Sequence, residues 1–357
     1  MLKVVPPSSP VKELEGFLVE CDEDTGFVSF TATNLQSSIQ RRIKTNIETG
    51  SSFVIFAKII TQIISILDGD DVNFSMTKDG WITVSGGNCT YTLPVLLPQN
   101  YPKPEMPFPE DTIKITRICD MYTRTANTVG NDSNKLSLTG IHLDIFSDMV
   151  KAVGCDGNRM ATLKSPSDCG GKLSITIPKI SLYHLANAVT NDDVLDVGIC
   201  GKSIVFMKNG LLFTSRLIDE VYMDSDAVMN YNDKCYTAVV EAGALAEAVD
   251  SINMFAKLSD DSPRMKMRFL EDQIDLSIQC EATNAQMVVP AIISKPMPED
   301  GFYYNTAYFA DCFKTVKGKL EIFVSSKGMA ILSDSVSQYM MTNTRPTAIT
   351  IKPKKDN

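Results

Sequence analysis

One pattern of residues recurs three times along the chain, at a spacing of about 125 residues, and this repeat constrains the fold more than any local motif. Each copy opens with two alternating apolar segments, which is the pattern of paired β-strands. The second segment of each copy ends at a polar residue, and these ends are Asn34, Asp156 and Glu281. Because each copy must be the same packed unit, the sequence predicts three domains of one α+β type.

An amphipathic helix follows the paired strands in each copy. Its apolar residues recur at intervals of three and four positions, which places them on one helix face. The residues in the three copies are Phe56, Ile59, Ile60, Ile63, Ile64 and Leu67, then Leu182, Leu185, Ala186 and Val189, then Phe309, Cys312, Phe313 and Val316. Strand-rich segments at 81–96, 203–218 and 329–344 close the copies.

We expect domain boundaries that give 1–108, 109–233 and 234–357, the last with a short C-terminal tail. The second and third domains each have about 31 residues before their first paired strand, whereas the first has fifteen, including three prolines. The first domain therefore lacks its opening strand and helix. Either the start is truncated or the protein is a divergent one. Truncation predicts exposed apolar residues on the first helix and an unpaired sheet edge.

Composition indicates a soluble protein. Hydrophobic residues make up 44% of the 357 residues, yet none of the apolar stretches approaches the roughly 20 residues that a membrane helix needs. The start has no signal-peptide pattern, so we expect a cytoplasmic protein without membrane contact. The nine cysteines include no C-x-x-C pair, which argues against both a disulfide framework and a thiolate metal site.

Enzyme signatures are scarce. His142 and His184 are the two histidines, which leaves little material for a histidine metal site or a Ser-His-Asp triad. The stretch from Asp196 to Ser203 resembles a phosphate loop but has Asp196 where the first glycine is required. We therefore expect no catalytic residues, no metal and no cofactor, and a small-molecule enzyme is the least favoured function.

Net charge alone argues against a tight nucleic-acid binder. The formal charge is −9, whereas phosphate contact requires Lys and Arg. A net charge is an average, however, and a basic surface can exist within an acidic exterior. The placement of the charges must decide.

A turn is the simplest interpretation of Asp156-Gly-Asn-Arg159, since Asp-Gly and Gly-Asn are turn dipeptides. In its context, the segment from Leu136 to Ala161 resembles the central-domain signature of bacterial sliding clamps, the beta subunits of DNA polymerase III. Five further segments, before and after it in the chain, match the family in the same order, and the resemblance spans residues 8 to 345. They are Thr31–Leu35, Leu96–Pro102, Ile177–Lys179, Phe213–Asp219 and Tyr339–Arg345.

The resemblance implies a head-to-tail homodimer that closes into a ring of six similar domains. Each protomer would be a crescent with helices on the inner face and antiparallel sheets outside. Duplex DNA would pass through the ring irrespective of sequence, and the ring would make DNA polymerase III processive. Expected partners are the polymerase catalytic subunit, the clamp loader and other proteins with a clamp-binding motif. The protein itself would not be an enzyme.

Basic residues near the predicted inner helices are candidates for the DNA channel. On the helix expected to open the second domain, Lys114, Arg117 and Arg124 lie apart from the apolar face. Such a stripe is also typical of an ordinary solvated face. Weaker candidates are Lys58, Lys179, Lys314 and Lys317. The helix opening the third domain departs from this pattern, since it carries Glu241, Glu247 and Asp250.

The resemblance also places a partner-peptide pocket between the second and third domains. Flexible methionines suit a pocket that accepts several peptides, although Met160, Met223 and Met340 could equally be core residues. Thr342 to Thr344 replace the family's Met-Pro-Met, so a more polar floor is expected. The pocket residues carried over are Lys135, Leu138, Cys155, Gly157, Asn158, Arg159, Met160, Met223, Val228, Met340, Met341, Thr342, Asn343, Thr344 and Arg345.

The ring joint carried over from the family pairs Tyr91 of the first domain with Met254 and Phe255 of the third. An exposed aromatic residue meeting Met-Phe would form an apolar patch. A second hypothesis is a clamp-derived protein that binds partner peptides but does not encircle DNA. The missing elements of the first domain and the acidic third-domain helix favour it.

Overall fold

The computed structural model describes residues 1–68, 71–77, 80–131, 134–229, 233, 235–256, 264–279 and 284–345. Glu281 and the predicted tail lie outside these residues. The α-helices within them are α1 (Ala57–Ile66), α2 (Ile118–Thr125), α3 (Lys179–Ala186), α4 (Ser225–Met229), α5 (Ala242–Ala256) and α6 (Thr306–Phe313).

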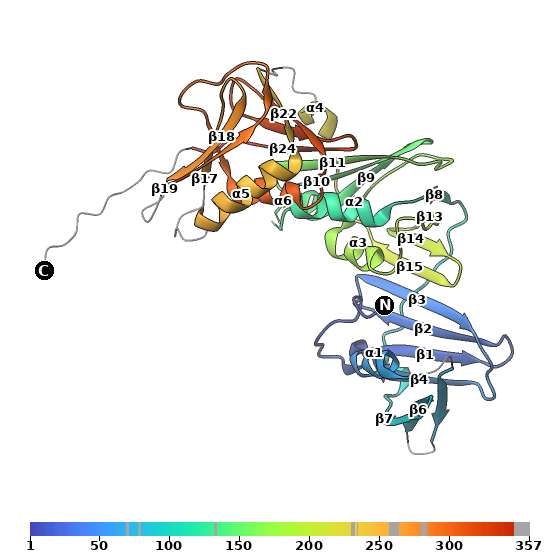
Figure 1. Ribbon diagram of the computed structural model, residues 1–357. Coiled ribbons are helices and arrows are strands. Elements are labelled where there is room, and N and C mark those ends of the chain that lie inside the picture. The colour runs from blue at the N-terminus through green and yellow to red at the C-terminus, as the bar shows by residue number, and fades with distance from the viewer. Residues whose placement is uncertain are drawn as a thin grey trace, which may run out of the picture.

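The chain bends into an arc (Figure 1). Helices α5, α6, α2, α3 and α1 follow one another along the inner side of the bend, and most strands lie outside them. This arrangement confirms the predicted crescent of repeated α+β units. None of the described helices is long and apolar enough to cross a membrane.

Two large antiparallel sheets each run from one repeat into the next. The first has the order β4-β1-β2-β3-β15-β14-β13-β8, and β3 pairs with β15 so that Ile39 lies opposite Phe213. Both residues are fully buried, so the first two repeats share a core. The strands are β1 (Gly16–Asp22), β2 (Phe27–Thr33), β3 (Ser37–Lys44), β4 (Ser51–Phe56), β8 (Ile113–Ile115), β13 (Leu195–Cys200), β14 (Ser203–Lys208) and β15 (Leu211–Arg216).

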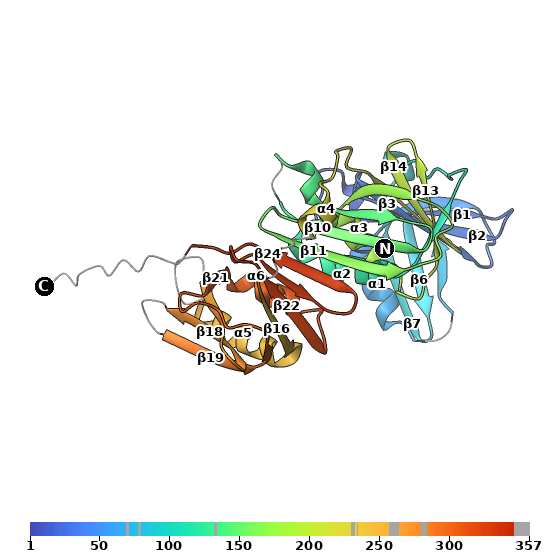
Figure 2. The ribbon, with the colours of Figure 1, turned by 90° about the horizontal axis from the view of Figure 1, so that it is seen from above.

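The second sheet joins the second and third repeats in the same way. Its order is β12-β9-β10-β11-β24-β23-β22-β16-β20, and β10, β11 and β24 run side by side in Figure 2. The strands are β9 (Gly140–Ile145), β10 (Met149–Cys155), β11 (Arg159–Pro166), β12 (Leu173–Pro178), β16 (Tyr236–Glu241), β20 (Ile292–Ile293), β22 (Lys319–Val324), β23 (Ala330–Ser333) and β24 (Ser337–Met341).

Two smaller sheets complete the repeat at the ends of the arc. The order β19-β18-β17-β21 reproduces β3-β2-β1-β4, and β5-β6-β7 corresponds to β13-β14-β15. The small sheet has no strand corresponding to β8 or β16 among the described residues. The strands are β5 (Asn73–Met76), β6 (Trp81–Gly86), β7 (Cys89–Pro94), β17 (Arg264–Phe269), β18 (Gln273–Gln279), β19 (Asn284–Pro290) and β21 (Phe302–Asn305).

In the first repeat, apolar residues are exposed where a strand equivalent to β8 and β16 would lie. All of β5 is exposed. On α1, Ile60 and Ile63 are buried, whereas Ile59 and Ile64 are 44% and 43% exposed. In the other repeats α2 packs on α3 and α5 packs on α6. The predicted apolar face of α1 is therefore only half covered, while Leu182, Leu185, Phe309, Cys312 and Val316 are buried as predicted.

Candidate peptide site and inner face

A small apolar cluster lies where the second repeat meets the third. Five residues of the predicted pocket, Leu138, Cys155, Met160, Val228 and Met340, belong to it. The cluster also contains residues that the sequence did not indicate, namely Val153, Tyr222, Met229, Phe323, Met329 and Ile331. Strands from both repeats and helix α4 thus form one apolar surface.

Strand pairing explains how the two methionines come together. Met160 on β11 lies opposite Met340 on β24, and both are buried, with exposed fractions of 0% and 6%. They form the floor of the cluster. Met341 follows Met340 on a strand, so its side chain points to the opposite face. It packs in the core of the third repeat instead, so its predicted place in the pocket wall is wrong.

The rim consists of exposed residues around this floor. Met223 is 40% exposed, Leu136 is 48% exposed, and Lys135, Gly157 and Asn158 are also exposed. Leu136 was not among the predicted residues. The floor is therefore apolar, and Met223, next to Tyr222, and Leu136, two residues before Leu138, are candidates for its rim by their closeness in sequence to members of the cluster.

The turn Asp156–Arg159 is held on both sides. Asp156 Oδ1 accepts hydrogen bonds from the backbone N–H groups of Asn158 and Arg159, at 2.9 and 3.0 Å. Gly157 has φ +92°, and a Cβ at this position would meet open space, so only its backbone conformation favours glycine. Thr342 donates from its backbone N–H and from its hydroxyl to the Asn158 carbonyl. These bonds attach the turn to the segment that follows β24.

The rest of that segment leaves the apolar cluster. The Thr344 N–H donates to the Tyr303 carbonyl at 2.7 Å, and Arg264 donates to the Arg345 carbonyl. Asn343, between Thr342 and Thr344, is exposed. Thr344 and Arg345 are thus fixed against β21 and β17, away from Met160 and Met340.

Arg159, a predicted pocket residue, turns toward α6. Its guanidinium donates from Nη1 to Asp311 Oδ2 at 2.7 Å and from Nε to Asp156 Oδ2 at 2.9 Å. It also lies 4.2 Å from the ring centroid of Tyr308. Hydrogen bonds to both carboxylates raise the pKa of Arg159, against the effect of its burial.

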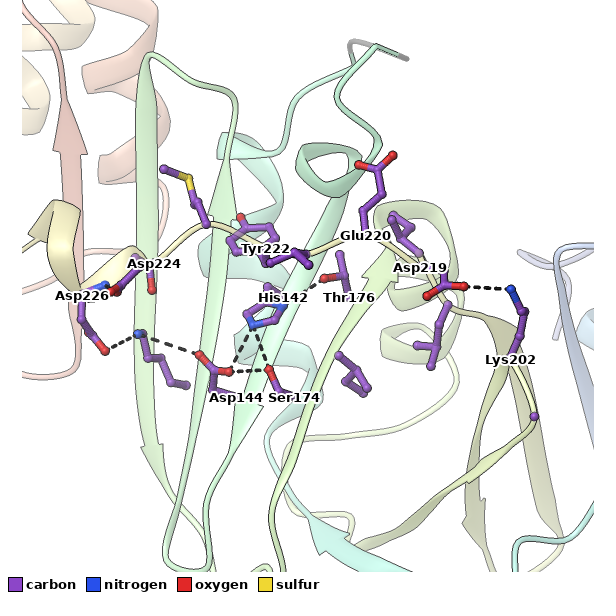
Figure 3. A pocket seen from close by; sticks show the side chains of 18 residues that line it. His142, Asp144, Ser174, Thr176, Lys202, Asp219, Glu220, Tyr222, Asp224 and Asp226 are labelled. Atoms are coloured by element: carbon purple, nitrogen blue, oxygen red, sulfur yellow. Dashed lines mark hydrogen bonds and ion pairs between the residues drawn. The ribbon is translucent and has the colours of Figure 1, made fainter.

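A polar cavity of about 620 Å³ lies beside the apolar cluster, between β9, β12 and the segment 217–226. Figure 3 shows the Tyr222 ring above His142, stacked with ring centroids 4.4 Å apart. Lys151 pairs with Asp226 at 2.8 Å. No sequence pattern indicated this cavity, because its side chains come from five separate segments of the chain.

The polar groups in the cavity do not form a catalytic triad. Asp144 and Ser174 both lie at His142 Nε2, at 3.1 and 3.3 Å, while Nδ1 faces Thr176. A triad needs the carboxylate on one ring nitrogen and the nucleophile on the other. Burial lowers the pKa of His142. Within the described residues, no cluster of His, Cys, Asp or Glu could hold a metal ion.

The predicted basic stripe of the second domain is not present as a stripe. Lys114 lies on β8, because Ile113 and Ile115 pair with Val197 and Leu195 as alternating strand residues. Arg117 precedes α2 in a left-handed conformation with φ 60°. It pairs with Asp120. The helical periodicity read across this stretch was therefore wrong.

Arg124 is on α2 but is only 20% exposed and pairs with Asp334 of the third repeat. Other basic candidates are more open. Lys58 on α1, Lys314 directly after α6 and Lys317 in the segment between α6 and β22 are exposed. Lys179 begins α3, and burial lowers its pKa. Glu241 ends β16 and is not on the helix as expected, whereas Glu247 and Asp250 lie within α5, so the helices of the inner side carry acidic as well as basic residues.

At opposite ends of the arc, two edge strands lack the strand partner that their equivalents have in the other repeats, among the described residues. They are β7, which carries Tyr91, and β19. In the other repeats the equivalent strands, β3 with β15 and β11 with β24, pair with each other. Met254 near the end of α5 is 61% exposed, and Phe255 is partly buried.

Comparison with known proteins gives one consistent result. The family description "DNA polymerase III beta subunit, N-terminal domain" matches residues 1–107, and "DNA polymerase III beta subunit, central domain" matches residues 112–224. The beta sliding clamp of Bacillus subtilis is 23% identical over 350 residues, covering 92% of this chain and 89% of that protein. That of Synechococcus elongatus is 22% identical over 320 residues, covering 87% and 84%.

Solved structures show the same fold. The DNA polymerase III beta subunit of Thermotoga maritima superposes with a TM-score of 0.87 at 16% identity, covering 97% of this chain and 95% of that one. The DNA polymerase sliding clamp of Bacillus subtilis gives a TM-score of 0.84 at 20% identity, with coverages of 97% and 95%.

Proposed function

We infer the function of this chain from its family, because the chain belongs to the DNA polymerase III beta subunits, the bacterial sliding clamps. It is a DNA sliding clamp and not an enzyme. As a ring around duplex DNA, it makes the replicative polymerase processive. The following paragraphs propose how its own residues serve that function.

Ring closure follows from the repeat. Each boundary inside the chain is a pairing between the last strand of one hairpin group and the last strand of the next, as in β3 with β15. The same pairing between β19 of one copy and β7 of a second would close a ring of two chains, since a heterologous contact can close by rotation. Tyr91 lies on β7, and Met254 and Phe255 would extend the contact from α5. This repeated junction is the observation that carries the proposal.

Weak electrostatic contact with DNA fits the charges on the inner side. Lys58, Lys314 and Lys317 are exposed on or just after helices of that side, and Lys179 stands at the start of α3. Lys114 and Arg117 remain secondary candidates, and the ion pair of Arg124 ties it to Asp334. A ring retains DNA by topology, so a few screened contacts are sufficient and permit sliding.

Partner proteins would bind through a short apolar peptide over the cluster of Met160 and Met340. Such a peptide needs an apolar surface with a polar edge. The cluster supplies the apolar floor, Met223 and Leu136 are exposed apolar residues, and Asn158 supplies the polar edge. Candidate partners are the polymerase catalytic subunit, the clamp loader and other proteins with a clamp-binding motif. Replication would place all of them in the cytoplasm.

A clamp-derived protein that binds peptides without encircling DNA remains the second candidate. The observations that favour it are the acidic residues Glu247 and Asp250 within α5 and the internal ion pairs of Arg117 and Arg124. In that case the peptide site would be retained and ring closure lost.

Loading onto circular DNA separates the two candidates. The protein, incubated with its clamp loader and a nicked circular duplex, should remain with the DNA during gel filtration and should be lost when the circle is cut once. Retention that survives linearisation but disappears with added salt would indicate ordinary electrostatic binding instead. Absence of retention with intact peptide binding would favour the second candidate.

A further inference from the structure

We propose that Arg159 is a positioning residue that ties the peptide site of the second repeat to helix α6 of the third, and so sets peptide affinity without touching the peptide. The inference rests on the proposed function, since it assumes that the apolar cluster around Met160 binds a partner peptide. It revises the predicted role of Arg159 as part of the pocket wall.

Strand alternation separates Arg159 from the peptide surface. Arg159 and Met160 are consecutive on β11, and consecutive side chains on a strand point to opposite faces. Met160 contributes to the apolar floor, whereas Arg159 contacts Asp311 and Tyr308 of α6. The contacts that fix the Arg159 side chain therefore also fix the backbone of β11, which positions Met160.

Three groups fix the Arg159 guanidinium. Asp311 and Asp156 each accept one hydrogen bond from it, and the Tyr308 ring lies against its face. The side chain is 14% exposed. A planar guanidinium can make such bonds in two directions while it stacks, and a lysine ammonium cannot. The site is therefore specific for arginine.

Asp156 transmits the position of Arg159 to the rim of the peptide site. One carboxylate oxygen accepts from Arg159 Nε, and the other accepts from the N–H groups of Asn158 and Arg159. The Asn158 carbonyl in turn holds Thr342. Loss of the Arg159 guanidinium would leave one carboxylate oxygen of Asp156 without its hydrogen-bond donor and so loosen the turn at the rim.

Asp311 connects the same network to the inner face. Its other oxygen accepts from Lys314, which is a candidate DNA contact. The pKa of Asp311 is low despite burial because Lys314 and Arg159 both donate to it. One carboxylate is thus shared by Arg159, behind the peptide site, and by Lys314, an exposed residue directly after α6.

Conservative variants of the full chain test this inference. Arg159→Lys keeps the charge but loses the fork, and Asp311→Asn keeps the shape but loses the charge. Arg268→Lys is a matched control, because Arg268 pairs with Asp275 within the third repeat at 3.6 Å, away from the boundary. The probe is a fluorescein-labelled pentapeptide, Ser-Leu-Ser-Leu-Phe, followed by anisotropy, with urea unfolding of each variant in parallel.

Arg159→Lys and Asp311→Asn should each weaken peptide binding about fivefold. The double variant should bind the peptide no more weakly than the weaker-binding single variant, because both substitutions remove the contact between residues 159 and 311. Arg268→Lys should bind as the parent does. Unchanged affinity in both single variants, or additive losses in the double variant, would overturn the inference. If one variant does not fold, the other decides by the same comparison with the control.

Failure of the proposed function gives a different result. A parent protein that binds no peptide and is not retained on nicked circles would refute the proposed function itself. A parent that does both, with variants that match it in peptide affinity, would refute only the role of Arg159.

Discussion

Arg124 Nη1 donates a hydrogen bond of 2.9 Å to Asp334 Oδ2 across the boundary between the second and third repeats, and a second bond of 2.7 Å to Ser337 Oγ. The Asp334 side chain is only 6% exposed. Its other oxygen accepts from the backbone N–H groups of Val336 and Ser337, which shapes the β23–β24 turn. Arg124 therefore stabilises the boundary and is not a free cation on the inner face.

Arg124→Ala should lower the free energy of unfolding by about 2 kcal/mol, because it leaves a nearly buried carboxylate without its cation. Retention on nicked circular DNA should change little at a temperature where the variant is folded. Lys58→Ala provides the opposite control, since Lys58 is exposed on α1: stability should be unchanged, while electrostatic contact with DNA should weaken and depend less steeply on salt. Urea unfolding and DNA retention at several salt concentrations measure both effects, and a stable Arg124→Ala variant with impaired retention would contradict this assignment.

Met223→Glu should reduce peptide affinity about tenfold, because a charge would replace an apolar contact at the rim. Met223 is 40% exposed, so unfolding should be unaffected. Met160→Glu makes a useful contrast, since Met160 is fully buried and a charge there should destabilise the protein itself. Peptide anisotropy and thermal unfolding report the two outcomes. Normal peptide binding by Met223→Glu would remove Met223 from the site.

Tyr91→Asp together with Met254→Glu should convert a dimer into monomers, because charges would be placed on both sides of the proposed β7–β19 joint. Sedimentation equilibrium at several protein concentrations measures the change. Met76→Glu is the matched control, since Met76 is 44% exposed on β5, at the other edge of the same sheet. A doubly substituted chain that stays dimeric would place the joint elsewhere.

Acid should weaken the boundary between the first two repeats through His184. This residue is 4% exposed, and its Nδ1 lies 2.9 Å from Ser37 Oγ on β3. Burial lowers the pKa of His184 from 6.5 to about 4. Between these values the unfolded chain binds the additional proton, so stability falls as the pH decreases from 6.5 toward 4.

His184→Gln should therefore flatten the pH dependence of the urea midpoint between pH 6.5 and 4. Carboxylates that are stabilised in the folded state, such as Asp311, have a pKa below 3.8 and act at lower pH. The parent and the variant need to be compared at each pH, because the substitution also removes the contact with Ser37. Parallel curves for the two proteins would show that His184 does not cause the effect.

Much of the fold could be predicted because the same pattern recurs. A buried strand such as β10 and a helix such as α6 have clear periodicities, and the repetition supported each assignment with two others. The stretch around Lys114 failed because Ile115 fits both patterns: it alternates with Ile113 as on a strand and stands three residues before Ile118 as on a helix. Only the pairing of β8 with β13 decides between them.

The site was predictable in composition but less so in orientation. Met160 and Met340 were correctly brought together, yet the side chains of Arg159 and Met341 point to the other face of their strands. Family resemblance transfers positions along the chain, and the partner of a long side chain depends on residues such as Asp311, about 150 positions away. His142 and Tyr222 stack for the same reason, without any local signal.

Hydrogen-bonded sheets that continue across the β3–β15 and β11–β24 junctions make the arc-shaped protomer stiff. Flexing it at either internal seam would rupture a ladder of backbone bonds and open the core beneath. In the proposed ring of two chains, the two joints between the chains are the places that could open without breaking these internal sheets. DNA would then enter at one of these joints, so the few strand residues there would govern its entry while the rest of the ring stays rigid.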